Sequence, residues 1–170
     1  MFKPRSGELV RRVRMGESSL AEIAKRHRWA VELLAPRRGE SVLEIGCGHG
    51  IATGLVLKAG AKMVAACIRR NEGLGRLTAF ESDFEDLDLG RFDAAFAVNV
   101  DFVRHEDRGW ARAFGKAVTA GGRIVLVLEA PTIRTADRFA LNAAASLAGM
   151  GFEVDTQLGE GMVAVVGRRR

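Results

Sequence analysis

Three glycines within five residues, directly after a short apolar run, constrain this chain more than any other feature. Residues 41–50 read Ser-Val-Leu-Glu-Ile-Gly-Cys-Gly-His-Gly, and an apolar, helix-like pattern follows over residues 51–58. Glycine is required where the backbone turns with positive φ, or approaches a ligand so closely that a Cβ would collide. Open α/β sheets bind their ligands at the carboxyl ends of the strands. The pattern therefore predicts a buried strand that enters a helix through a ligand-binding loop.

The spacing of these glycines distinguishes between two kinds of loop. The dinucleotide-binding pattern G-x-G-x-x-G would place its third glycine at position 51, which is Ile51. The pattern present is E-x-G-x-G-x-G, with Glu44 two residues before Gly46. A carboxylate at this place accepts hydrogen bonds from an ammonium or a hydroxyl group, whereas it would repel a pyrophosphate. The spacing therefore disfavours a dinucleotide.

The segment Val42–Gly50 closely resembles the first motif of the class I S-adenosylmethionine-dependent methyltransferases. In that family the glycine loop cradles the cofactor, and the acidic residue helps to hold its amino-acid part. The alternative is a plain strand-turn-helix with incidental glycines. The resemblance implies S-adenosylmethionine as the cofactor, and it implies cofactor contacts from Glu44, Gly46, Cys47, Gly48 and Gly50.

Strand-like and helix-like segments alternate along the rest of the chain, which predicts a parallel sheet with helices on both faces. Gly159-Glu160-Gly161 joins two final strand-like runs, which predicts an antiparallel hairpin. The resemblance implies the same layout, a Rossmann-like α/β methyltransferase fold, and extends over residues 28–166. We expect strands at 42–45, 63–68, 77–80, 92–98, 123–129, 152–158 and 162–166, with helices at 19–35, 51–59, 106–118 and 134–147.

The length of 170 residues predicts a single domain. We expect a basic helical preface at 1–40, an α/β core at 41–167 and a frayed basic tail at 168–170. The preface holds ten Lys and Arg residues against five Glu, whereas acidic and basic residues cancel in the other 130. An RNA partner could use that surplus. A solvated helix face is favoured, because only Trp29 interrupts the charges with an aromatic ring.

Other sequence features exclude several function classes. No apolar run approaches the ~20 residues that a membrane-spanning helix needs. The chain has two cysteines, Cys47 and Cys67, and no Cys/His cluster that would predict a zinc site or a disulfide framework. We therefore expect a cytoplasmic protein without a metal site.

The second strand departs from the family pattern. Relatives end this strand with an acid that hydrogen-bonds the ribose hydroxyls of the cofactor, and the matching position here is Cys67. A thiol is a poor acceptor and does not replace a carboxylate. Residues 61–71 also fit a helix, as though the strand and its acid had been deleted. We favour a shortened strand, because Gly60 stands where the preceding helix should end.

The resemblance assigns three further cofactor contacts. Asp83 and Phe84 follow the third strand, where relatives bind and cover the adenine, and Asn99 ends the fourth strand beside the sulfonium position. The alternative for Asp83 is a turn in an acidic surface loop, and for Asn99 an Asx turn. The sequence after Asn99 is not the Asn/Asp-Pro-Pro-aromatic motif of methyltransferases that act on nucleobase or amide nitrogens.

These features together predict a methyltransferase that transfers a methyl group to a small molecule. His105 is a weak candidate for a general base, because it follows the fourth strand near the expected mouth of the site. Two alternatives stay open. One is a nucleic-acid methyltransferase that uses the basic preface, and the other is a methyltransferase-fold binding module whose cofactor binding is weak or lost.

Overall fold

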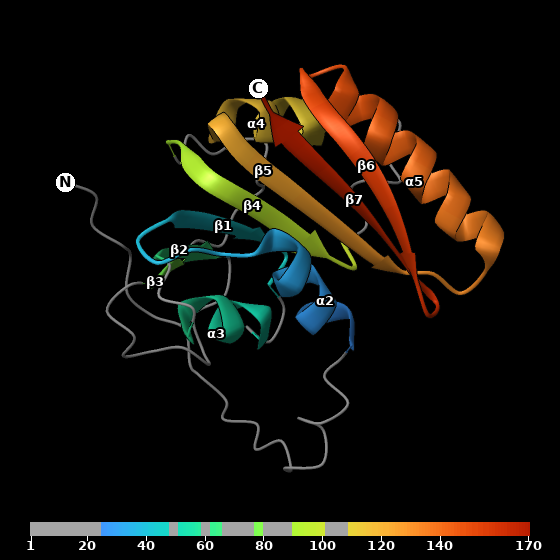
Figure 1. The fold of residues 1–170 in the computed structure, drawn as a ribbon, viewed down its shortest axis with the longest axis horizontal. Coiled ribbons are helices and arrows are strands. Elements are labelled where there is room, and N and C mark those ends of the chain that lie inside the picture. Colours follow the sequence, from blue (N-terminus) through green and yellow to red (C-terminus); the bar gives the residue numbers. More distant parts are fainter. Residues whose placement is uncertain (1–24, 48–50, 59–61, 66–76, 80–89, 101–108) are drawn as a thin grey trace, which may run out of the picture.

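A seven-stranded sheet organises the structure, a computed structural model that describes residues 25–47, 51–58, 62–65, 77–79, 90–100 and 109–170. The strand order is β3-β2-β1-β4-β5-β7-β6. The first five strands are parallel, and β7 lies antiparallel between β5 and β6 (Figure 1). The strands are β1 Ser41–Ile45, β2 Lys62–Ala65, β3 Leu77–Ala79, β4 Phe92–Val98, β5 Val118–Glu129, β6 Phe152–Gly159 and β7 Met162–Arg169.

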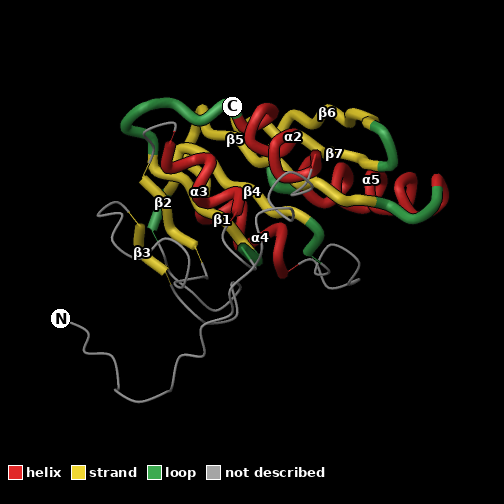
Figure 2. The backbone as a smooth tube through the Cα atoms, turned by 90° about the horizontal axis from the view of Figure 1, so that it is seen from below, coloured by secondary structure: helices red, strands yellow, loops and turns green. Residues whose placement is uncertain are grey.

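Within the described ranges, four helices cover the sheet, two on each face (Figure 2). The N-terminal pair, α2 Lys25–Leu34 and α3 Ile51–Lys58, packs on one face, and α4 Gly109–Ala117 with α5 Ile133–Ala148 packs on the other. None of these helices is long and apolar enough to cross a membrane.

Strand β4 shows how the sequence supplies both faces of the core. Alternate side chains of a strand point to opposite faces of its sheet. Ala94, Phe96 and Val98 join the cluster beneath α2 and α3, whereas Ala95 and Ala97 join the cluster beneath α4 and α5. All five are buried, which is why this strand reads as a continuous apolar run.

The second strand is present, and it is short. Lys62–Ala65 pairs in parallel with β1, and Ala65 is the partner of Glu44. The strand prediction for this region is therefore confirmed over residues 62–65, where the helical alternative is wrong. The expected strand extended to residue 68, and positions 66–68 lie outside the described residues.

Two strand boundaries differ from the sequence predictions. Strand β5 begins at Val118 instead of residue 123, because Val118 pairs with Phe92 before an irregularity in the β4–β5 register. The expected frayed tail at 168–170 is wrong for Arg168 and Arg169, which belong to β7. Arg169 donates to the carbonyl oxygens of Gly115 and Val118, and its guanidinium lies 5.7 Å from the centre of the Phe152 ring. These contacts hold the C-terminal end of the strand in place.

Candidate functional site at the carboxyl edge of the sheet

The carboxyl ends of β1 and β4 meet closely at one edge of the sheet. Gly46 follows β1 with φ of +67°, a conformation that favours glycine. A Cβ on Gly46 would lie 2.6 Å from Cγ1 of Val100, which follows β4. The first glycine of the loop therefore makes the left-handed turn that the sequence predicted. Its close approach is to a neighbouring side chain of this chain, whereas the sequence predicted an approach to a ligand.

Asn99 connects the ends of β4 and β5. Its backbone N–H donates to the carbonyl oxygen of Val127 at 2.9 Å, and its Oδ1 accepts from the backbone N–H of Glu129 at 2.7 Å. Its φ of +54° is left-handed, which Asn tolerates better than most residues. This side-chain bond reaches a strand 30 positions away, so it is not the local Asx turn that the sequence offered as the alternative. The amide oxygen of Asn99 is committed to β5, so it fixes the edge that the ligand would approach.

Glu44 and Cys47 stand on either side of the Gly46 turn, and both are buried. The Glu44 side chain is on β1 with only 3% of the residue exposed, and Cys47 is 6% exposed. A carboxylate this deeply buried has to be satisfied by hydrogen bonds or charge. Glu44 is thus held within the protein just before the glycine loop, at the place where the sequence predicts a cofactor contact.

Helix α2 runs antiparallel to β5 along its length. At the carboxyl edge, Arg26 pairs with the Glu129 carboxylate at 2.6 Å, and Lys25 pairs with Glu160 in the β6–β7 turn at 2.7 Å. At the opposite end of the helix, Arg123 of β5 donates to the carbonyl oxygens of Leu34 and Ala35. The helix therefore begins at the carboxyl edge, beside Asn99 and the ends of β4 and β5.

His27 lies at the same end of α2 and is half-buried. Burial lowers its pKa below the ordinary value, and the neighbouring Arg26 lowers it further, against an opposing effect of Glu129. Its Nδ1 is buried and has no hydrogen-bond partner among the described residues. The sequence interpretation did not single out this histidine.

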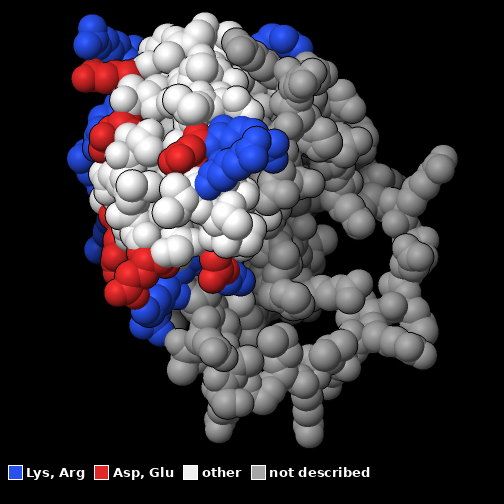
Figure 3. Space-filling model, turned by 90° about the vertical axis from the view of Figure 1, so that its right-hand side faces the viewer, with Lys and Arg blue, Asp and Glu red and all other residues white. Residues whose placement is uncertain are grey.

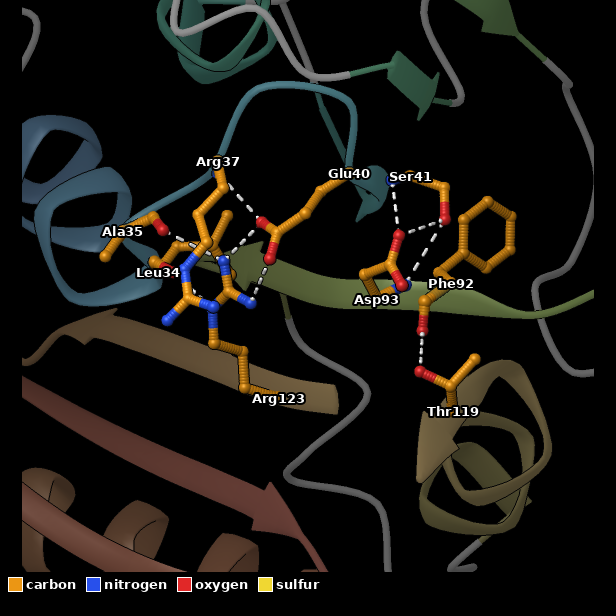
Figure 4. A network of polar contacts seen from close by, with 9 residues as sticks. All are labelled: Leu34, Ala35, Arg37, Glu40, Ser41, Phe92, Asp93, Thr119 and Arg123. Atoms are coloured by element: carbon orange, nitrogen blue, oxygen red, sulfur yellow. Dashed lines mark hydrogen bonds and ion pairs between the residues drawn. The ribbon is translucent and has the colours of Figure 1, made fainter. Parts of the chain in front are cut away.

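A polar network holds the opposite, amino edge of the sheet (Figure 4). Arg123 donates to both carboxylate oxygens of Glu40, at 3.0 Å from Nη1 and 2.6 Å from Nη2. Nearby, Asp93 accepts from the backbone N–H and hydroxyl of Ser41 at 2.7 and 2.9 Å. These contacts lower the pKa of Glu40, chiefly through Arg123, and that of Asp93, chiefly through the Ser41 N–H. The sequence interpretation missed this network because its members are far apart in the chain.

The structure places only part of the predicted site. Glu44, Gly46 and Cys47 lie together at the end of β1, and Asn99 lies at the end of β4 in the adjacent strand. The described ranges contain no cluster of His, Cys, Asp and Glu side chains that could hold a metal ion. The other predicted positions, Gly48, Gly50, Cys67, Asp83, Phe84 and His105, lie outside the described residues.

Comparison with known proteins matches this geometry to solved structures. No protein-family model matches the chain, and no curated protein matches its sequence. A SAM-dependent methyltransferase from Aquifex aeolicus superposes with a TM-score of 0.65 at 13% identity, covering 91% of this chain and 98% of that one. The chain has the class I methyltransferase fold. The seven-strand order, its antiparallel β7 and the glycine turn after β1 all fall within that fold.

Two other neighbours with the methyltransferase fold were solved with bound ligands. The Burkholderia thailandensis 1,6-didemethyltoxoflavin-N1-methyltransferase, bound to 1,6-didemethyltoxoflavin and S-adenosylhomocysteine, has a TM-score of 0.67 at 16% identity. The alignment covers 89% of this chain and 81% of that enzyme. Human N-acetylserotonin methyltransferase, in complex with SAM, has a TM-score of 0.67 at 13% identity. That alignment covers 85% of this chain and 52% of the human enzyme, so this chain spans about half of the human enzyme's length.

Proposed function

We propose that this protein binds S-adenosylmethionine at the carboxyl edge of the sheet and transfers its methyl group to a small molecule. The observation that carries the proposal is the E-x-G-x-G-x-G loop at the end of β1 in a sheet of order 3-2-1-4-5-7-6. The buried Glu44 carboxylate and the left-handed turn at Gly46 suit a ligand that carries an ammonium group. Structural neighbours that bind this cofactor, or its demethylated product, support the same assignment.

The chain's own residues have three tasks in this reaction. The cofactor supplies the activated methyl group on its sulfonium. The glycine turn and Glu44 hold the amino-acid part, and Asn99 keeps the ends of β4 and β5 in register beside the acceptor. Because α2 begins at this edge and is tied to Glu129, it covers the approach and helps to exclude water. Alignment of the acceptor with the methyl group is itself a large part of catalysis.

A small-molecule acceptor is favoured over a nucleic acid. Figure 3 shows the face that carries α5 and the β6–β7 hairpin. On the described part of this face, basic and acidic side chains are interspersed on a mostly uncharged surface. Nucleic-acid binding relies on a continuous basic patch. The neighbours that carry named acceptors, N-acetylserotonin and 1,6-didemethyltoxoflavin, act on small molecules.

Calorimetric titration with S-adenosylmethionine and with S-adenosylhomocysteine tests the proposal. Wild type is expected to bind both with one site per chain. Gly48→Val puts a branched side chain in the loop and is expected to abolish binding while the protein stays folded. Gly115→Ala, on helix α4, is the control. A Cβ there makes only an ordinary contact, 3.5 Å from the Cβ of Met150. Wild-type binding by a folded Gly48→Val variant would contradict the site.

The second candidate function is a binding module whose cofactor affinity is weak. The observation that favours it is Cys67, at the position where relatives of the methyltransferase fold carry the ribose acid. The parallel β1–β2 register pairs Glu44 with Ala65, and Cys67 follows Ala65 by two positions in the sequence. Cys67→Asp restores a carboxylate, so S-adenosylmethionine binding is expected to tighten about tenfold. Cys67→Asn, which lacks the negative charge, is the control and is expected to gain less. Unchanged binding by a folded Cys67→Asp variant would reject this account of the ribose contact.

A further inference from the structure

A hollow of about 270 Å³ lies at the amino edge of the sheet, at the opposite end of β1, β4 and β5 from the proposed cofactor site. The polar network of Figure 4 forms part of its wall. The turn before β1, the start of β4, the first half of β5 and the end of β7 all contribute to it. Its charged lining residues are Arg37, Glu40, Asp93, Arg123 and Arg168.

An irregularity in β5 creates this hollow. Phe92 of β4 pairs with Val118 of β5, and the next pair is Ala94 with Arg123. Between these two pairs β4 advances by two residues and β5 by five. The extra residues of β5 form a bulge that crosses close to β4. A Cβ on Gly122 would lie 2.6 Å from Cγ1 of Val118 and 2.9 Å from the carbonyl oxygen of Asp93. Bulges of this kind redirect side chains and often lie beside functional sites.

The carboxylates of the hollow are already engaged by the protein. Both oxygens of Glu40 accept from Arg123, and Asp93 accepts from Ser41. Arg37 and Arg168 form no ion pair with any carboxylate in the described part of the chain. Three guanidinium groups and two carboxylates therefore line the hollow, which leaves one net positive charge, and Arg37 and Arg168 are the two guanidiniums without an ion pair among the described residues.

The pairing of β5 with β7 concentrates this surplus. Arg123 and Arg168 are direct cross-strand partners in the antiparallel register. Directly opposite residues project from the same face of a sheet, and like charges in such a pair are destabilising. The Glu40 carboxylate pairs with Arg123, whereas Glu153, the cross-strand partner of Arg168 on β6, pairs with Arg170 at 3.3 Å. An anion in the hollow would relieve this repulsion.

We propose that this hollow binds the phosphate group of a small ligand through Arg37 and Arg168. Guanidinium groups match phosphate oxygens in geometry and charge. A phosphate group presents three acceptor oxygens, which two guanidiniums can bind together, whereas a carboxylate presents two. The hollow is open, so the rest of the ligand extends into solvent. This site does not rest on the proposed methyl transfer, because it lies at the other edge of the sheet.

Nuclear magnetic resonance titration of the wild-type protein at constant ionic strength tests the site. The probes are inorganic phosphate, glycerol 3-phosphate and acetate. Both phosphate probes are expected to give saturable shifts of the Gly121, Gly122 and Arg168 amides, and acetate is expected to give none. Tighter binding of glycerol 3-phosphate would identify an ester as the ligand, and equal binding would identify the phosphate group alone. No saturable shift with phosphate, or equal binding of acetate, would overturn the proposal.

Paired arginine variants test the assignment of the two guanidiniums. The R37Q/R168Q variant is expected to weaken phosphate binding about tenfold or more. The R38Q/R138Q variant removes the same net charge from exposed positions outside the hollow and is expected to keep the wild-type affinity. Equal affinity in the two variants would overturn the assignment. Parallel titration with S-adenosylmethionine reports on the carboxyl edge, so failure of either proposal is visible without the other.

Discussion

The guanidinium of Arg123 and the carboxylate of Glu40 form a two-pronged ion pair, with nitrogen–oxygen distances of 3.0 and 2.6 Å. Their side chains are only 17% and 15% exposed. The same guanidinium also donates to the carbonyl oxygens of Leu34 and Ala35, which the end of α2 leaves without helical partners. One side chain of β5 therefore joins the end of α2 to the turn that enters β1. It sets the position of the helix whose other end lies at the proposed cofactor site.

Arg123→Gln is expected to lower the free energy of unfolding by about 2–4 kcal/mol, because it leaves Glu40 unpaired and two carbonyl oxygens without their donor. Arg123→Lys keeps the charge but loses the planar fork. Its free energy of unfolding is therefore expected to lie between those of wild type and Arg123→Gln. Urea unfolding followed by circular dichroism measures both. Arg138→Gln, an exposed change on α5, is the control. An equal loss in Arg123→Gln and Arg138→Gln would contradict this role.

The same pair predicts an acid-sensitive fold. Hydrogen bonds from Arg123 hold the pKa of Glu40 below its ordinary value in the folded state. The unfolded chain therefore binds this proton at higher pH than the folded chain does. The resulting stability is present above the unfolded pKa of about 4.3 and is lost as the pH falls through the folded pKa. The Ser41 contacts depress the pKa of Asp93, which acts in the same direction.

Urea unfolding at a series of pH values below neutrality measures this dependence. Glu40→Gln is expected to be less stable than wild type at neutral pH and to lose less stability as the solution is acidified. Glu153→Gln removes an exposed ion pair with Arg170 and serves as the control. If Glu40→Gln keeps the wild-type slope of stability against pH, the Glu40–Arg123 pair is not the source of the acid sensitivity.

Asn99 offers a test of how the carboxyl edge is held. Asn99→Gly keeps the left-handed φ without strain but loses the bond to the Glu129 N–H, whereas Asn99→Ala loses the bond and strains the backbone. The expected order of stability is wild type, then Asn99→Gly, then Asn99→Ala, with a total span of about 1–3 kcal/mol. Asn99→Asp keeps the accepting oxygen and is expected to stay near wild type. Equal stability of the Gly and Ala variants would show that the left-handed turn carries no strain.

Local patterns in the sequence predicted most of the fold. The apolar runs of β4 and β5 and the Gly-Glu-Gly turn before β7 each carry their signal within a few consecutive residues. Residues 61–71 are ambiguous in the sequence, because so short an apolar run fits a helix as well as a strand. The pairing of Lys62–Ala65 with β1 decides between them, and pairing is a property of two segments that no single window of sequence contains.

Contacts between distant residues could not be predicted in the same way. Arg123 contacts Leu34 and Glu40 across 89 and 83 positions, and Arg26 contacts Glu129 across 103. Nothing in the neighbourhood of any one arginine names its partner. Arg169 looked like part of a solvated tail for this reason, although its guanidinium is held by carbonyl oxygens of Gly115 and Val118. At the site, the glycine pattern predicted the turn at Gly46, while its contact with Val100 appears only in three dimensions.

That contact leads to the last prediction. Gly46→Ala adds a Cβ at a left-handed φ of +67° and 2.6 Å from Cγ1 of Val100, so it combines backbone strain with a collision. Gly161→Ala is a matched control, because Gly161 has the same φ of +67° and open space where the Cβ would lie. Both variants are expected to lose about 1–2 kcal/mol through the backbone conformation. Gly46→Ala is expected to lose about 1–3 kcal/mol more through overpacking.

Val100→Ala separates the two contributions at Gly46. In the double variant Gly46→Ala/Val100→Ala the methyl group that collides is gone, so the added loss at Gly46 should fall to that of Gly161→Ala. A double-mutant cycle from urea unfolding measures this coupling, expected at about 1 kcal/mol or more. Additive losses in the cycle would mean that the turn moves to accommodate the new Cβ. The ends of β1 and β4 would then be held by something other than the contact between Gly46 and Val100.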